Sequence, residues 1–151
     1  MRRLKVAVVL LLAATSCSSG SEYLLLRDFF GASRLRDRTA LASFATVVFE
    51  PQEQGIVTTF SISRVGSEQR TPIDTARDLR VAELSLDDPV QPIDLKGGKR
   101  EMISKEIVVS APVRGMDGRA RTRIISVVIE RAVVGPRAGR WIVTGVASRG
   151  N

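Results

Sequence analysis

The sequence contains no histidine, and only one of its 151 residues is a cysteine. The missing histidine excludes histidine-based acid–base or nucleophilic catalysis and metal sites with imidazole ligands. A single cysteine excludes internal disulfides and zinc sites built on paired cysteines. Asp87 and Asp88 lack the further acidic ligands of a calcium loop. We therefore expect neither a catalytic centre nor a metal or cofactor.

Long apolar runs are also missing. The longest, Val6–Ala14, has nine residues, whereas a membrane-spanning helix needs about 20. Basic residues precede this run, and the small residues Thr15 and Ser16 follow it. A basic start, a short apolar run and a small-residue end are typical of a secretory signal peptide. The sequence therefore predicts a signal peptide at residues 1–16.

The one cysteine follows this segment directly. The motif Leu12-Ala-Ala-Thr-Ser-Cys17 resembles a bacterial lipobox, although Ala14 stands where leucine is more usual. The resemblance implies that the Cys17 thiol carries a diacylglycerol and that the chain is cut before it. It also implies a membrane anchor on the periplasmic side, with Ser18 indicating outer-membrane delivery in a Gram-negative cell. We expect residues 17–21 to form the lipidated cysteine and a short flexible tether.

The net charge is only modestly basic once the signal peptide is set aside. The chain has 23 basic and 16 acidic residues, and three of the basic ones lie in residues 1–16. The remaining 20 basic and 16 acidic residues give a net charge of +4. Such an excess does not indicate a nucleic-acid partner, and an exported protein would rarely meet one.

The apolar fraction of 44% and the charged fraction of 26% are those of a globular protein of one domain. We place this domain at residues 22–148 and a short tail at 149–151. Helical spacing of apolar residues predicts a helix over 22–37, with Ser21 as its cap. Gly31 interrupts that helix, which suggests close packing at this point. A second short helix is expected from Asp37 or Thr39 to Phe44.

The rest of the domain shows sequence patterns that are typical of β-strands. Alternating or β-branched segments joined by turns predict an antiparallel sheet of four to six strands, with the helical unit on one of its faces. The fold class is therefore α+β. The expected strands are Ala45–Phe49, which Pro51 ends, Gly55–Val65, Leu79–Leu86, Arg100–Val113, Arg119–Val134 and Arg140–Ser148.

Two stretches carry a family resemblance over roughly residues 22–148. The helical segment FFGASRLRDRTALASF and the ending SVVIERAVVGPRAGRWIVTGVAS, with Gly139-Arg-Trp-Ile-Val143, resemble the NTF2-like fold. The resemblance implies a curved sheet that wraps helices into a cone, and sheets of this family often form homodimers. A cystatin-like domain, with one helix across four or five strands, is the alternative.

Some NTF2-like proteins are enzymes with an acid or base and a tyrosine donor in an apolar pocket. The only tyrosine here, Tyr23, lies at the start of the first helix, which is a poor place for such a donor. Asp28 and Asp37 lie beside Arg27 and Arg38, and this spacing indicates surface pairing. No catalytic residue is therefore carried over from the family.

Two groups of residues are candidates for binding. Arg119, Arg121 and Arg123 recur at period two, so on a strand they share one face. They form either a solvated edge paired with acids such as Glu101 or Glu106, or a surface that binds an anion or a partner. The aromatic residues either pack in the core or line a pocket, and the candidates are Phe29, Phe30 and Trp141.

Two functions remain open at this point. The first is a non-enzymatic envelope lipoprotein whose domain binds or scaffolds an envelope protein. The second is a cone that binds a small ligand or a lipid, with at most weak enzymatic activity. A closed, aromatic interior between helix and sheet would favour the first, and an apolar cavity of several hundred Å³ there would favour the second.

Overall fold

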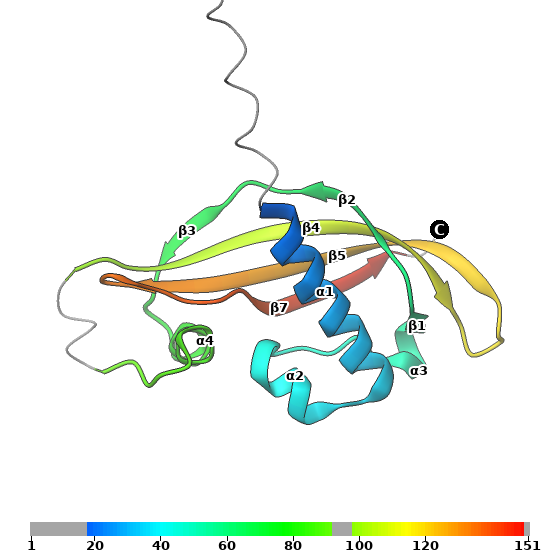
Figure 1. Cartoon of the computed structure of the whole chain (residues 1–151), viewed down its shortest axis with the longest axis horizontal. Helices are drawn as coiled ribbons and strands as arrows, with labels where there is room; N and C mark the ends of the chain where they lie inside the picture. The colour runs from blue at the N-terminus through cyan, green and yellow to red at the C-terminus, as the bar shows by residue number, and fades with distance from the viewer. Residues whose placement is uncertain (1–17, 92–97, 150–151) are drawn as a thin grey trace, which may run out of the picture.

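The computed structural model describes residues 18–91 and 98–149, so the predicted signal peptide and Cys17 lie outside the described residues. Within these ranges the chain forms an α+β fold with one antiparallel sheet, as predicted (Figure 1). The sheet has seven strands rather than four to six, because short strands line the edges of the long ones. The elements are α1 (Ser18–Leu35), α2 (Arg38–Phe44), α3 (Pro51–Gln54), β1 (Ile56–Val57), β2 (Ser61–Val65), β3 (Gln69–Pro72), α4 (Ala76–Leu86), β4 (Arg100–Arg114), β5 (Ala120–Val134), β6 (Arg137–Ala138) and β7 (Ile142–Arg149).

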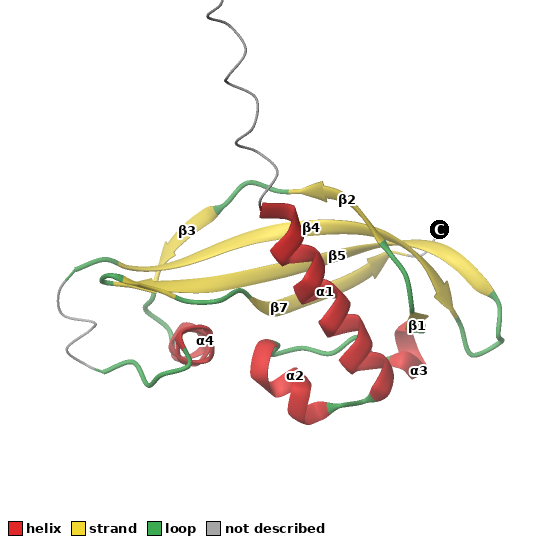
Figure 2. Ribbon diagram, in the orientation of Figure 1, coloured by secondary structure: helices red, strands yellow, loops and turns green. Residues whose placement is uncertain are grey.

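A long hairpin of β4 and β5 forms the centre of the sheet, and Figure 2 shows it bent along its length. Its register runs without a break from Arg100 opposite Val134 to Arg114 opposite Ala120. β7 pairs with β5, while β1, β2 and β3 pair in succession with the other edge of β4. The predicted strands at 100–113, 119–134 and 140–148 are therefore confirmed to within two residues, and β7 takes in Arg149, which we had placed in the tail.

Helix α1 crosses one face of this hairpin and confirms the predicted first helix. It starts at Ser18, so Ser21 lies inside the helix and does not cap it. Residues 18–21, which were expected to be a flexible tether, are thus the first turn of α1. The reason lies at Glu22, which is buried against Lys105 of β4 and fixes this end of the helix on the sheet.

Gly31 lies in the middle of α1, and the structure gives it no packing role. A Cβ atom built at this position meets nothing within 4 Å, so the expectation of close packing was wrong. Alanine loses less backbone entropy than glycine on entering a helix. We therefore expect Gly31→Ala to raise the free energy of unfolding by about 0.5–1 kcal/mol, measured by urea denaturation. An unchanged or lower stability would contradict the open space seen around this residue.

Helix α2 is also confirmed, and Asp37 caps it by accepting a hydrogen bond from Ala40 N at 3.0 Å. The strand predicted at Ala45–Phe49 is not formed. Only Ala45 makes a bridge, parallel to Val143, and the segment then continues beside the helices. Pro51, which was expected to end a strand, instead begins α3, where its missing N–H costs nothing.

The single strand predicted at Gly55–Val65 is divided into β1 and β2. Its first residue, Gly55, adopts a φ of +88°, and a Cβ there would lie 2.8 Å from Arg114 O. This close approach to β4 requires glycine. The short edge strand β3 was not predicted, because all four of its residues are exposed and its sequence shows no alternation.

The largest error concerns Leu79–Leu86, which is not a strand but part of helix α4. A capping box begins this helix: Thr75 Oγ1 accepts from Asp78 N at 3.0 Å, and Asp78 Oδ2 accepts from Thr75 N at 3.3 Å. Burial of the Asp78 carboxylate raises its pKa, but the hydrogen bonds from Thr75 outweigh this effect and hold the pKa of Asp78 below its ordinary value. Val81, Ala82 and Ser85 are buried at helical spacing.

Helix α4 packs on the opposite face of the hairpin from α1. Side chains alternate between faces along a strand, and the two helices contact alternate residues of β4 and β5. The cluster with α1 includes Ile107, Val109 and Val127, whereas the cluster with α4 includes Met102 and Ala132. The predicted unit of α1 and α2 therefore covers one face, as expected, and α4, which was predicted as a strand, covers the other.

Two polar contacts hold α4 in this position. At its first turn, Arg77 Nη2 forms an ion pair at 2.5 Å with Glu130 of β5, and this hydrogen bond raises the pKa of Arg77. Near its last turn, Ser85 Oγ accepts from Ala132 N at 3.0 Å and donates to Arg140 O at 2.7 Å. Ser85 thus ties the helix both to β5 and to the segment that leads into β7.

Candidate binding pocket

The space between α1 and the sheet is filled by side chains. Leu26 and Phe29 are fully buried there, and Phe30 packs its ring 5.5 Å from Phe49 and 5.4 Å from Phe60. Phe29 and Phe30 therefore belong to the core, although Phe30 also reaches a shallow hollow of about 200 Å³ beside residues 57–60.

Trp141 is half-buried at the start of β7, where two cations lie over its ring. Lys105 Nζ lies 4.5 Å and Arg131 Cζ 4.7 Å from the ring centroid. Lys105 also forms an ion pair with Glu22, whose side chain is 1% exposed. These contacts fasten the first turns of α1 to β4, so Trp141 has a structural role here and does not face an open pocket.

Of the three candidate arginines Arg119, Arg121 and Arg123, only the last two lie on one strand. Arg119 lies in the turn before β5, so it does not share the strand geometry of Arg121 and Arg123. Arg121 pairs with Asp117 at 2.9 Å, and the hydrogen bonds from Arg119 N–H and the Arg121 side chain lower the pKa of Asp117.

The acids expected opposite the arginines pair elsewhere. Glu106 pairs with Arg64 at 3.0 Å, and Glu101 pairs with Arg70 at 3.1 Å. The predicted ion pairs were therefore wrong. Strands β2 and β3 pair with the edge of β4 that faces away from β5, and their arginines form the ion pairs with Glu106 and Glu101.

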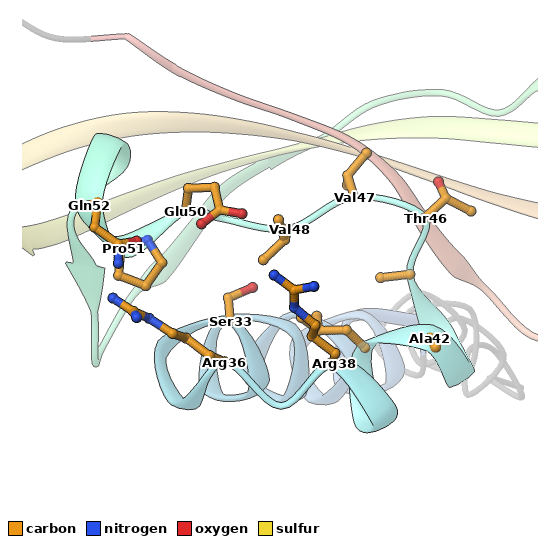
Figure 3. A pocket seen from close by; sticks show the side chains of 12 residues that line it. Ser33, Arg36, Arg38, Ala42, Thr46, Val47, Val48, Glu50, Pro51 and Gln52 are labelled. Atoms are coloured by element: carbon orange, nitrogen blue, oxygen red, sulfur yellow. The ribbon is translucent and has the colours of Figure 1, made fainter.

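A pocket of about 480 Å³ lies in the helical part of the fold, at the corner between α1 and α2 (Figure 3). The residues that follow α2 and the start of α3 form its opposite wall. Most of its apolar lining comes from α2 and this wall, with Leu41, Ala45, Val47, Val48 and Pro51.

Six polar residues line this pocket: Ser33, Arg36, Arg38, Thr46, Glu50 and Gln52. Ser33 is buried, and its Oγ accepts a hydrogen bond from Phe49 N at 3.2 Å. Arg36 follows the last residue of α1 in a left-handed conformation, with a φ of 54°, and its guanidinium lies against the side-chain amide of Gln52. Figure 3 shows Arg38 and Glu50 extending toward the same space from opposite walls.

Arg36, Arg38 and Glu50 are the charged side chains of the pocket, and all three are exposed. In the part of the chain that the structure describes, none of them forms an ion pair, whereas the charged residues Arg64, Arg70, Arg77 and Lys105 do. Arg38 was expected to pair with Asp37, but Asp37 is used as the cap of α2. By contrast, the expected pair of Arg27 and Asp28 is present at 2.9 Å.

The pocket residues were not singled out from the sequence. The available signal was the run Arg34-Leu-Arg-Asp-Arg38, in which three cations surround one acid between two helices. Such a run is typical of a solvated helix–helix corner, and nothing in it indicates that Glu50 lies opposite.

No protein-family model, no curated protein and no solved structure matches this chain. Across residues 18–91 and 98–149, no helix is long and apolar enough to cross a membrane. The same residues contain no group of three side chains suited to hold a metal ion.

Proposed function

We propose that this chain is a membrane-anchored bacterial envelope lipoprotein whose α+β domain binds or scaffolds an envelope protein without catalysing a reaction. The observation that carries the proposal is the position of its only cysteine. Cys17 ends a lipobox-like motif after a signal-peptide pattern, and helix α1 of the folded domain begins at the next residue. The modified residue and the domain are thus adjacent.

The proposed anchor would hold α1 close to the bilayer. A single acyl chain binds membranes only marginally, but two or three chains hold durably at about 0.8 kcal/mol per buried CH₂. Because the helix rises only about 1.5 Å per residue, Tyr23 and Leu24 in its first two turns would lie near the headgroups. With Ser18 after the cysteine, we propose the periplasmic side of the outer membrane if the cell is Gram-negative.

A scaffold is favoured over a ligand-binding cone because the layer between α1 and the sheet is filled. Helix α1 lying across a long bent hairpin supports an NTF2-like arrangement, while α4 on the other face departs from a simple cone. Ile124 and Val128 are 40% and 36% exposed on the sheet face opposite α1. These apolar side chains support a protein partner at that face, including a second copy of this chain.

The anchor is tested by replacing Cys17 with alanine and measuring the intact mass and the detergent-phase partitioning of the protein. We expect the unmodified chain to be cut before Cys17, to gain the mass of a lipid and to partition into detergent. Cys17→Ala should remain uncut and unlipidated, because only a thiolate accepts the diacylglycerol.

Ser18→Ala serves as the matched control, because it alters the neighbouring residue and keeps the thiol. It should be cut and lipidated like the unmodified chain. A mature protein whose Cys17 thiol is free and reacts with maleimide would refute the lipoprotein proposal.

A further inference from the structure

We propose that the pocket at the α1–α2 corner binds a small zwitterion with an apolar side chain, such as a free apolar amino acid or a short apolar peptide. This site does not depend on the anchor at Cys17 or on the partner proposed for the sheet face. At this corner a cavity, an apolar wall and unpaired charges of both signs coincide.

The charges define the class of ligand. Arg38 supplies a planar guanidinium, which matches a carboxylate with two parallel hydrogen bonds. Glu50 supplies an acceptor for an ammonium group on the facing wall. The two side chains line the same cavity without pairing with each other, so a ligand that carries both charges satisfies both residues at once. A simple anion would leave the Glu50 carboxylate without a partner.

Local structure holds the backbone that carries both charges. Arg38 is the first residue of α2, whose start is held by the Asp37 cap. Glu50 precedes α3, and its backbone N–H donates to Gln54 Oε1 at 2.9 Å. Arg36 lies against the side-chain amide of Gln52 at one end of the pocket, and Arg38 extends toward the space that Glu50 also faces.

The rest of the pocket suits an apolar side chain. Leu41 and Ala45 are buried beneath it, and Val47 and Val48 are partly exposed to it. Ser33 adds a hydroxyl group beside this apolar wall. The volume of about 480 Å³ lies within the range of roughly 300–1,000 Å³ that is usual for small-molecule sites.

The proposal is tested by titrating the full chain, purified in an uncharged detergent, with five compounds followed by isothermal calorimetry. Leucine and leucyl-leucine carry both charges and an apolar side chain, N-acetyl-leucine lacks the ammonium, leucine amide lacks the carboxylate, and glycine lacks the side chain. We expect leucine or leucyl-leucine to bind with a Kd below about 1 mM and the other three at least about tenfold more weakly. Whichever of the first two binds more tightly distinguishes a free amino acid from a peptide.

Variants assign the contacts. Arg38→Gln should weaken leucine binding by about tenfold or more, while Arg80→Gln, an exposed arginine of α4, should leave it unchanged. Glu50→Gln should remove the preference for leucine over N-acetyl-leucine, and Glu53→Gln is its matched control on α3. Absence of saturable binding, equal binding of N-acetyl-leucine and leucine to the unmodified chain, or unchanged binding in Arg38→Gln would each overturn the proposal.

Discussion

Replacing Lys105 by methionine is expected to lower the free energy of unfolding by about 3–5 kcal/mol at pH 7. Lys105 is only 8% exposed, and its ammonium group forms the ion pair that neutralises the buried carboxylate of Glu22. Methionine keeps most of the side-chain volume, so the main loss is electrostatic. Glu22 is left as an uncompensated charge, and its second carboxylate oxygen already has no hydrogen-bond partner. Urea denaturation followed by circular dichroism measures the effect.

Removing both charges should reverse most of this loss. Buried ion pairs gain little net stability, because desolvation of the two ions offsets their attraction. The double variant Glu22→Leu/Lys105→Met is therefore expected within about 1 kcal/mol of the original protein or above it. Arg64→Met, which breaks the exposed pair with Glu106, is the control and should cost less than about 1 kcal/mol. Equal effects of Lys105→Met and Arg64→Met would show that the buried pair is not formed in solution.

The second large effect is expected from Gly139→Ala. A Cβ at this position would overlap Ser85 Oγ and lie 2.8 Å from Ser85 O, which belongs to the rigid backbone of α4. To relieve this contact, residues 139–140 must move away. The hydrogen bonds from Gly139 N to Ala132 O at 2.8 Å and from Arg140 N to Ser85 O at 2.9 Å would then be strained or lost. We expect a loss of about 3 kcal/mol from overpacking and broken hydrogen bonds.

Hydrogen exchange locates this effect. The backbone amides of α4 should lose protection before those of α1, because the clash lies between α4 and the residues leading into β7. Adding Ser85→Ala removes only the hydroxyl and leaves the backbone contact, so it should not restore stability. Gly31→Ala, with open space around it, is the matched glycine control. A melting temperature of Gly139→Ala equal to that of the original chain would contradict the packing of α4 on this segment.

The sequence predicted the parts of the fold that depend on long, uniform periodicity. Helix α1 and strands β4 and β5 each bury one face along much of their length, so their apolar residues recur regularly. Helix α4 was missed because Leu79, Val81, Leu84 and Leu86 also fit an alternating pattern. The decisive signal was Thr75 followed three residues later by Asp78, the capping box that a strand would not need.

The candidate site could not be derived in the same way. Its members Ser33, Arg38 and Glu50 come from three separate segments, and their meeting depends on the tertiary path of residues 45–50. That path was predicted as a strand, so Glu50 was not placed near α2. Lys105 was likewise unpredictable, since its partner Glu22 lies 83 residues earlier in the chain.

The uninterrupted β4–β5 hairpin also has a consequence for the order of folding. Its two strands are joined by a turn of a few residues, so their pairing closes only short loops and can form early. The core residues of α1 and α4, in contrast, have their packing partners in the second half of the sequence. During synthesis the amino-terminal half therefore emerges without the surface on which it folds. The segments of α1 and α4 therefore have no core to pack against until the carboxyl-terminal half has been synthesised.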